Sequence, residues 1–139
     1  MPTAVVTGAG RGLGAAIAVR FASAGWHVVR ADVEGTDTYL DVTDAQGCRE
    51  LAEAVQPDVW INNAGVLGAG DAATQPDQVI EQVVSVNLLG VIHSTRAALA
   101  VMREREQGRG GVESSGSAIA RQHWLGKAPR SPSAQARAI

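Results

Sequence analysis

The stretch that decides the fold is VTGAGRGLG, residues 6–14, which holds four glycines in nine residues. It follows the apolar run at residues 4–6 and precedes an alanine-rich segment at residues 15–18, a pattern that predicts a buried strand, a turn and a helix. Glycine lets a backbone turn tightly and approach a pyrophosphate where a Cβ would intrude, and the N-terminus of the following helix favours that anion. The stretch predicts a phosphate-binding turn, with a tight turn that binds no ligand as the simpler interpretation.

The spacing of the glycines fits two related patterns. Gly8, Gly12 and Gly14 fit Gly-x-x-x-Gly-x-Gly. Gly10, Gly12 and Ala15 fit the looser Gly-x-Gly-x-x-Gly/Ala fingerprint of dinucleotide-binding turns. Because glycine clusters are common in turns, this pattern indicates nucleotide binding only together with a second nucleotide-binding residue elsewhere in the chain.

A suitably spaced acidic residue follows the glycine turn. Asp32 ends the next predicted strand, residues 26–33, and lies 18 residues beyond Gly14. This is close to the position of the acid that accepts hydrogen bonds from the ribose of a bound dinucleotide. A carboxylate there would repel a 2′-phosphate, so it favours NAD over NADP, although Arg11 and Arg30 add positive charge that weakens the preference.

Short apolar runs alternate with helical patterns through the first 107 residues. Such alternation indicates βαβ units and a parallel sheet. Right-handed crossovers then give an α/β fold of the Rossmann type, a doubly wound parallel sheet with its first strand central. The predicted strands are residues 4–7, 26–33, 38–42 and 58–62, and the predicted helices are residues 12–24, 44–55 (capped by Thr43 or Asp44), from 76 onward, and 84–106.

The expected fifth strand is where this pattern fails. GGVESSGS, residues 110–117, has one apolar side chain, Val112, where a buried parallel strand needs a continuous run. Composition changes nearby, because residues 1–107 carry seven basic and thirteen acidic residues, whereas residues 108–139 carry five basic residues and one acid. We therefore expect a dinucleotide-binding domain at 1–107, an irregular and poorly ordered tail at 108–139, and a sheet incomplete at its C-terminal side with the fourth strand near an edge.

Four motifs, TGAGRGLG, LDVTD, NNAG and VNLLG, occur in this order, and with them the first 107 residues resemble the short-chain dehydrogenase/reductase family. The resemblance implies an NAD(P)-dependent oxidoreductase that transfers hydride between a nicotinamide cofactor and an alcohol or carbonyl substrate. It implies that the glycine turn binds pyrophosphate, that one acid binds ribose, that the LDVTD motif flanks the adenine and that the NNAG motif lines the groove and braces the sheet. The cofactor-binding residues so implied are Gly8, Gly10, Arg11, Gly12, Leu13, Gly14, Asp32, Asp41, Val42, Asn63, Ala64 and Gly65.

Asn87 matches the asparagine that interrupts a helix in this family and helps to hold a proton-relay water. Taken without the family, it is a polar residue inside an apolar helix and must find partners or solvent. The helix around it, residues 84–106, resembles the one through which these enzymes pair, which implies a possible homo-oligomer. A helix that faces the core is an equally good interpretation.

The catalytic pair of the family is missing from this sequence. A tyrosine followed four residues later by a lysine is expected, but the chain has one tyrosine, Tyr39, on a predicted strand. Ser117 matches the family's serine, with Ser114 and Ser115 as competitors, and the APRSPSA segment places Arg130 where the tyrosine is expected. An arginine stays protonated and cannot act as a base. The predicted catalytic residues are Asn87 and Ser117.

Three hypotheses account for this loss. A reading-frame shift after about Gln107 explains the composition of the tail, the truncation and the lost pair together, and we favour it. A short paralogue that binds nucleotide without catalysis is the second. A complete enzyme with an unusual acid such as His123 is the third. The alternative function is therefore a non-catalytic dinucleotide-binding or regulatory protein.

Composition bounds the remaining possibilities. The formal net charge of −2 argues against nucleic acid and anionic membranes as partners. Cys48 is the only cysteine, so no internal disulfide is expected. We expect no signal peptide, no apolar run near the length of a membrane span, no metal site at His27 or His93, and a cytoplasmic location.

Overall fold

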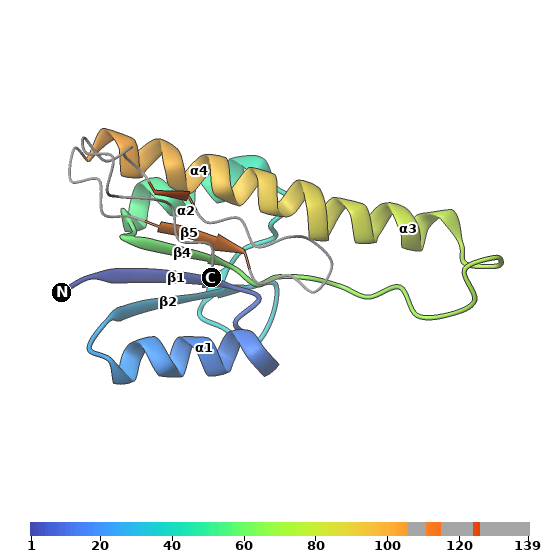
Figure 1. Ribbon diagram of the computed structural model, residues 1–139, viewed down its shortest axis with the longest axis horizontal. Helices are drawn as coiled ribbons and strands as arrows, with labels where there is room; N and C mark the ends of the chain where they lie inside the picture. The colour runs from blue at the N-terminus through green and yellow to red at the C-terminus, as the bar shows by residue number, and fades with distance from the viewer. Residues whose placement is uncertain (106–110, 115–123, 126–139) are drawn as a thin grey trace, which may run out of the picture.

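The computed structural model describes residues 1–105, 111–114 and 124–125. The strands in these residues form one sheet, with the order β3-β2-β1-β4-β5-β6 (Figure 1). All neighbours pair in parallel except β5 and β6, which are antiparallel. The predicted doubly wound, Rossmann-type sheet with its first strand central is therefore confirmed, and β1 lies between β2 and β4. The strands are β1 (Thr3–Thr7), β2 (His27–Asp32), β3 (Thr38–Tyr39), β4 (Val59–Asn62), β5 (Gly111–Ser114) and β6 (Trp124–Leu125).

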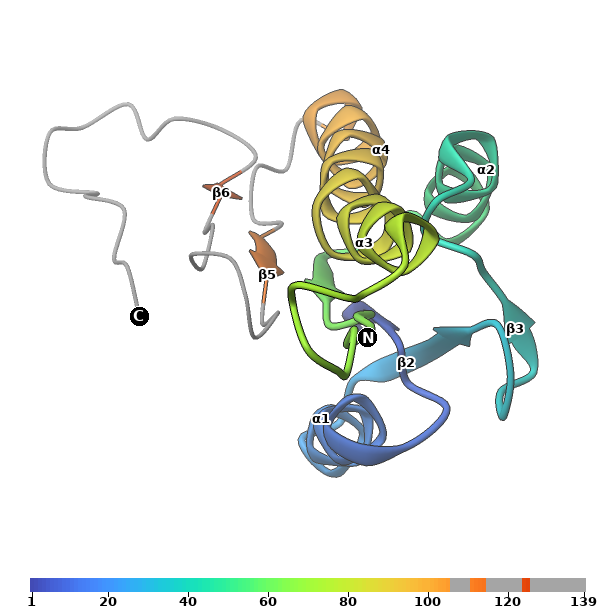
Figure 2. The same cartoon turned by 90° about the vertical axis from the view of Figure 1, so that its right-hand side faces the viewer.

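Helices cover both faces of the sheet. Seen end-on, α1 lies on one side, and α2 lies beside α4 on the other (Figure 2). The run from α3 through a short π-helix, η1, into α4 is continuous and extends past the sheet at one end (Figure 1). The helices are α1 (Gly12–Ser23), α2 (Ala45–Val55), α3 (Asp77–Val84), η1 (Ser85–Leu89) and α4 (Gly90–Glu104).

Local sequence signals set the helix ends. The carboxylate of Asp44 accepts a hydrogen bond of 3.0 Å from the Gln46 amide, which satisfies a free N–H at the start of α2. Gly25, at φ +83°, follows α1 in the left-handed region that ends many helices. Pro76 precedes α3 with φ −61°, and Asp77 lies in the first turn of that helix. These predicted caps and starts are confirmed.

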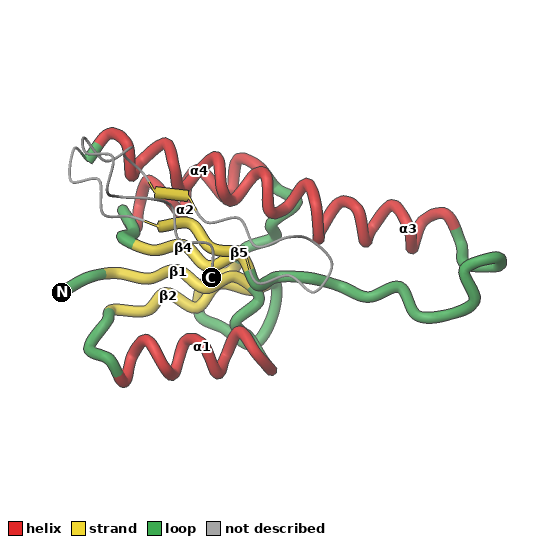
Figure 3. Tube along the Cα trace, viewed as in Figure 1, coloured by secondary structure: helices red, strands yellow, loops and turns green. Residues whose placement is uncertain are grey.

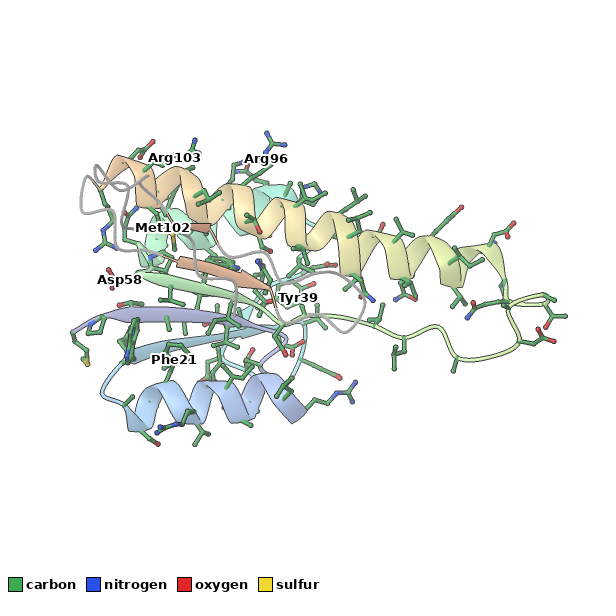
Figure 4. The ribbon with its side chains drawn as sticks, viewed as in Figure 1. Phe21, Tyr39, Asp58, Arg96, Met102 and Arg103 are labelled. Atoms are coloured by element: carbon green, nitrogen blue, oxygen red, sulfur yellow. The ribbon has the colours of Figure 1, made fainter. Side chains whose placement is uncertain are left out.

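The alternation of side chains along the strands builds two cores. Val5 of β1 and Trp60 of β4 face α2 and α4, whereas Val6 and Ile61, one residue further on, pack with Ala18 of α1. Trp60 is fully buried and is the largest such side chain in the described residues. Figure 4 shows the polarity of α4, with Met102 directed toward the sheet and Arg96 and Arg103 directed away from it.

The α3–α4 run bears on the membrane prediction. Asp77–Glu104 is 28 residues long and its most apolar 18 residues have a mean hydropathy of 1.3, so by length and composition alone it could cross a membrane. The helix meets this test although polar and charged residues such as Asn87 and Arg96 interrupt it, so it is not the uninterrupted apolar run that the sequence was expected to lack. A core helix passes the same test, and Ala97, Ala98 and Met102 of α4 are buried in the core shared with α2, so the test is weak support for a span.

The fifth strand forms, contrary to expectation. β5 pairs in parallel with β4 from Val59↔Gly111 to Asn62↔Ser114. The prediction of a broken fifth strand and of β4 near an edge is wrong because the pairing of backbone N–H and C=O groups does not require apolar side chains, and the edge of β4 has such groups to pair. Most of the predicted irregular tail lies outside the described residues and stays a prediction.

Candidate functional site

A pocket of about 640 Å³ opens where the carboxyl ends of β1, β2 and β4 meet. The loops that follow these strands gather at the same end of the sheet (Figure 3). β1 has β2 on one side and β4 on the other, so the order of the strands reverses at β1. In open α/β sheets, ligands bind at the carboxyl ends of the strands where the order reverses. The pocket is lined by Gly8, Gly10, Arg11, Leu13, Gly14, Asp32, Val33, Glu34, Gly35, Leu40, Asp41, Val42, Asn63, Ala64, Gly65, Val66, Gln82 and Val86.

The glycine turn between β1 and α1 is packed too closely for side chains. A Cβ at Gly14 would lie 2.2 Å from the Gly8 carbonyl oxygen, and a Cβ at Gly8 would lie 2.7 Å from Cα of Ala64. Gly8 also has φ +65°, a conformation that other residues rarely adopt. Gly12 differs, because a Cβ there would meet nothing within 4 Å, although its φ is +57°. Gly12 is the one predicted cofactor residue that is absent from the described pocket wall.

Two polar side chains tie the ends of β1 and β4 together. The Thr7 hydroxyl accepts hydrogen bonds from the amides of Asn63 (3.0 Å) and Ala64 (3.1 Å). The side-chain amide of Asn63 donates to the carbonyls of Thr7 (3.1 Å) and Gly8 (3.0 Å). This network holds the glycine turn against the loop after β4, and it is the bracing that the NNAG motif implies.

The Asp32 carboxylate is fixed at the pocket wall by backbone groups. Its Oδ2 accepts from the Gly10 amide at 2.8 Å, and its Oδ1 accepts from the Val33 amide at 2.7 Å. Each oxygen of an ionised carboxylate can accept a further bond, so the group keeps acceptor capacity. Arg11 lies in the wall, but Arg30 lies outside it and donates to the Ala9 carbonyl. Of the two arginines expected to weaken the NAD preference, only Arg11 is part of the described wall.

The start of α1 faces the pocket without a side-chain cap. Arg11 at the N-cap position is extended (φ −154°), makes no capping hydrogen bond, and is followed by a first turn with no acidic residue. Leu13 and Gly14 of that turn belong to the pocket wall. Unsatisfied N–H groups and the positive end of the helix dipole therefore lie where an anion would be favoured.

The opposite wall is formed by the loop after β3. Asp41 accepts two hydrogen bonds from Thr43, at 2.9 Å from the amide and 2.7 Å from the hydroxyl, which fix its carboxylate. Val42 packs so closely against α4 that a Cβ at Gly90 would lie 2.6 Å from its Cγ2. Behind Val42, the Cys48 thiol is fully buried, and this burial raises the pKa of Cys48. Both predicted adenine-side residues thus lie in the wall.

Asn87 lies in the π-helix, where it pairs with the loop after β4. Its Oδ1 accepts from the Val66 amide at 2.8 Å, and its Nδ2 donates to the Val66 carbonyl at 2.8 Å. The prediction that this polar residue must find partners is confirmed, and its helix is interrupted as the resemblance implies. Asn87 is absent from the described pocket wall, whereas Val66 belongs to it, and a role in catalysis stays a prediction.

Sequence reasoning missed part of the wall. Val33 to Gly35 follow Asp32 directly, and the carboxyl end of a strand at the switch point was a signal that could have found them. Gln82 and Val86 lie four residues apart on α3 and η1, and Val86 directly precedes Asn87. That spacing places them on one side of the helix. The missed residues of the wall are Val33, Glu34, Gly35, Leu40, Val66, Gln82 and Val86.

Several candidates fall outside this pocket. Tyr39, on the edge strand β3, is 72% exposed and is not part of the described wall. Ser117 and Arg130 lie outside the described residues. Among the residues that the structure describes, no group of three His, Cys, Asp or Glu could hold a metal ion.

This chain is similar in sequence and in structure to known dehydrogenases. The family model for short chain dehydrogenases matches residues 2–129. An uncharacterized oxidoreductase of Mycobacterium bovis is 38% identical over 127 residues, which covers 76% of this chain and 51% of the relative. A short-chain dehydrogenase from Streptomyces avermitilis superposes with a TM-score of 0.73 at 30% identity, over 81% of this chain and 48% of that one. A bulky-bulky ketone specific alcohol dehydrogenase from Comamonas testosteroni gives 0.72 at 28% identity, over 85% and 55%.

A parallel sheet in this order, with a glycine-lined pocket at its switch point, defines a Rossmann-like α/β protein. The match over residues 2–129 narrows the class, and the chain belongs to the short-chain dehydrogenase family. Its homologues are oxidoreductases. The chain spans about half the length of the curated relatives and solved structures that it matches.

Proposed function

We propose that this chain binds NAD in the pocket at the carboxyl ends of β1, β2 and β4, as the nucleotide-binding part of an oxidoreductase that acts on an alcohol or carbonyl compound. The observation that carries the proposal is the Asp32 carboxylate, held by the Gly10 amide at 2.8 Å beside the glycine turn. An acid fixed at this point is suited to accept hydrogen bonds from ribose hydroxyls.

The residues present fit a dinucleotide. Gly8 and Gly14 let the turn pack against its own backbone and against Ala64, where a Cβ would clash, and the uncapped start of α1 favours a pyrophosphate. Asp32 would hold the ribose, and Asp41 with Val42 would flank the adenine. When bound, the nicotinamide cofactor supplies or accepts the hydride. The chain's own residues bind and orient it, with Thr7 and Asn63 keeping the two walls in register.

The charges of the wall favour NAD over NADP. Asp32, Glu34 and Asp41 bring three carboxylates to the described wall, and Arg11 brings one guanidinium. A 2′-phosphate near these carboxylates would be repelled. Arg30, which donates to the Ala9 carbonyl outside the wall, adds positive charge that weakens this preference.

We further propose that this chain alone has little or no turnover. Hydride transfer to a carbonyl needs a proton donor for the developing alcohol, and the sequence contains no Tyr-x-x-x-Lys pair. The second candidate function follows from the same observation: a non-catalytic dinucleotide-binding or regulatory protein. A helix stripe supports assembly with a second copy, since Ile80, Val84 and Ile92 of the α3–α4 run are 42–46% exposed. We propose a homo-oligomer through this stripe and a cytoplasmic location.

Fluorescence titration with NADH and NADPH tests the proposal. We expect NADH to bind saturably and more tightly than NADPH. We expect Asp32→Ala to lower the ratio of the NADH affinity to the NADPH affinity. Arg20→Met, at an exposed position on α1, is the matched control. Tighter binding of NADPH would contradict the role of Asp32, and no saturable binding of either nucleotide would contradict the proposed function. Oxidation of any alcohol in a broad panel would separate an enzyme from a non-catalytic binder.

A further inference from the structure

One peptide unit of the glycine turn is held at both ends by side chains of the same strand. The carbonyl of Ala9 accepts hydrogen bonds from Nε (3.1 Å) and Nη2 (2.8 Å) of Arg30. The amide of the next residue, Gly10, donates to Oδ2 of Asp32 at 2.8 Å. Arg30 and Asp32 are two residues apart on β2, so their side chains leave the same face of the strand. The Ala9–Gly10 peptide is therefore clamped in one orientation.

The position of Arg30 indicates that it acts through this peptide and not on a ligand. It lies outside the pocket wall, in a separate hollow with His27, Thr36 and Thr38. It is also exposed, so packing does not explain its placement. A guanidinium can direct two N–H groups at one carbonyl oxygen, whereas a lysine ammonium lacks this fixed fork.

The peptide needs such a constraint. Gly10 adopts backbone conformations more freely than other residues, and a disordered turn would have to lose that freedom when a ligand binds. The surroundings also leave it little space, because a Cβ at Gly10 would lie 2.3 Å from the Glu34 carbonyl oxygen and 2.9 Å from Oδ2 of Asp32. A rotated Ala9–Gly10 peptide would withdraw its N–H from the Asp32 carboxylate and release that carboxylate from its place in the wall.

We propose that Arg30 is a positioning residue for nucleotide binding: by holding the Ala9 carbonyl it orients the Gly10 N–H, which in turn fixes the Asp32 carboxylate for the ribose of the cofactor. The inference rests on the proposed function, since it assigns Arg30 a part in the same site. Arg30 itself makes no contact with the cofactor.

The test compares Arg30→Met, Arg30→Lys and the control Arg20→Met by two measurements. The first is amide hydrogen exchange at Gly10 in the nucleotide-free protein, with the sheet amides of Val5 and Ile61 as internal references. We expect faster exchange at Gly10 in Arg30→Met and no change at the references. The second is NADH affinity, which we expect to fall about threefold to tenfold, because the two lost hydrogen bonds come from an exposed group and act on the ligand only through the Gly10 peptide.

Arg30→Lys separates geometry from charge. It keeps the positive charge and loses the planar fork, so we expect Gly10 exchange and NADH affinity between those of the wild type and Arg30→Met. Wild-type values in Arg30→Met, or faster exchange at Val5 and Ile61 as well as at Gly10, would overturn the positioning role. If the wild-type chain does not bind NADH, the proposed function is contradicted, and with it the effect of Arg30 on cofactor binding. The exchange at Gly10 still tests whether Arg30 orients the Ala9–Gly10 peptide, because it is measured without nucleotide.

Discussion

The side chain of Asn87 pairs with the backbone of Val66 as a neighbouring strand would, with one bond accepted and one donated, each of 2.8 Å. The two residues are 21 positions apart, and their pairing joins the π-helix η1 to the loop that follows β4. Because Val66 lies in the pocket wall, these bonds hold one residue of that wall against η1. A π-helical turn inside an α-helix is frequently found at functional sites.

We expect Asn87→Ala to lower the free energy of unfolding by about 1–3 kcal/mol, because it leaves the amide and carbonyl of Val66 partly buried and without these bonds. Urea denaturation measures the change, with Gln78→Ala on the exposed surface of α3 as the control. Asn87→Asp is the sharper variant, since its carboxylate can accept from the amide but faces the carbonyl oxygen of Val66. That contact raises the pKa of the new carboxyl in the folded state above its unfolded value of about 4, so the deficit relative to wild type should shrink as pH falls through the raised pKa and become constant below about 4. A deficit that does not depend on pH would contradict this pairing.

Gly14 and Gly12 differ in what a methyl group would meet. At Gly14 a Cβ would lie 2.2 Å from the Gly8 carbonyl oxygen, which is backbone and cannot rotate away, whereas a Cβ at Gly12 meets nothing within 4 Å. We expect Gly12→Ala to cost about 1 kcal/mol, the strain of a positive φ, and Gly14→Ala to cost several times more or to prevent folding. Thermal unfolding of both variants checks the order. Equal effects would mean that the turn relaxes around Gly14.

The parts of this fold that could be predicted from the sequence are the local ones. The Asp44 cap, the glycine after α1 and the strand–turn–helix at residues 4–24 depend on residues within a few positions of one another, so their signals are read directly. The fold class followed from the alternation of these units, and the dinucleotide prediction from the spacing between Gly14 and Asp32. Eleven of the twelve predicted cofactor residues line the pocket, because the turns at the carboxyl ends of parallel strands meet at one edge.

The parts that could not be predicted depend on distant backbone partners. β5 is stabilised by pairing with β4, and its own side chains gave no sign of it. The partner of Asn87 is a backbone group, and the partner of Arg30 is a carbonyl 21 positions away. Every residue has a backbone carbonyl, so the sequence does not show which carbonyl a side chain will bind. Hydrogen bonds from side chains to distant backbone groups can be identified only from the positions of the strands.

The buried thiol of Cys48 predicts a dependence of stability on alkaline pH. Burial raises the pKa of Cys48 in the folded state, although the contact of its sulfur with the Ser94 hydroxyl at 3.6 Å acts in the opposite direction. The unfolded thiol, with a pKa near 8.5, ionises first, so stability is fully present below that pH and is lost as pH rises toward the raised value. The difference in unfolding free energy between wild type and Cys48→Ser should therefore change in favour of the serine variant above about pH 8.5. A constant difference from pH 7 to 10 would contradict the raised pKa.

Asp58 joins three elements at the end of the sheet away from the pocket. Its Oδ2 accepts from the amide of Thr3 at 2.7 Å, and its Oδ1 pairs with Nη2 of Arg105 at 3.2 Å. Arg105, directly after α4, also donates to the carbonyl of Gln56 at the end of α2. We expect Arg105→Met to lower stability by less than about 1 kcal/mol, since the ion pair is partly exposed and water screens it. Asp58→Ala should cost more, about 1–2 kcal/mol, because it removes the partner of a backbone N–H as well as the ion pair.

A double-mutant cycle in urea separates these two contributions. The double variant should lose about as much stability as Asp58→Ala alone, since the alanine already removes the ion pair, apart from the bond from Arg105 to Gln56. Asn at position 58 keeps a neutral acceptor for Thr3, so Asp58→Asn should recover most of the loss. A loss in Asp58→Asn as large as that in Asp58→Ala would mean that the charge of Asp58, and not its bond to the Thr3 amide, holds β1 and β4 to the end of α4.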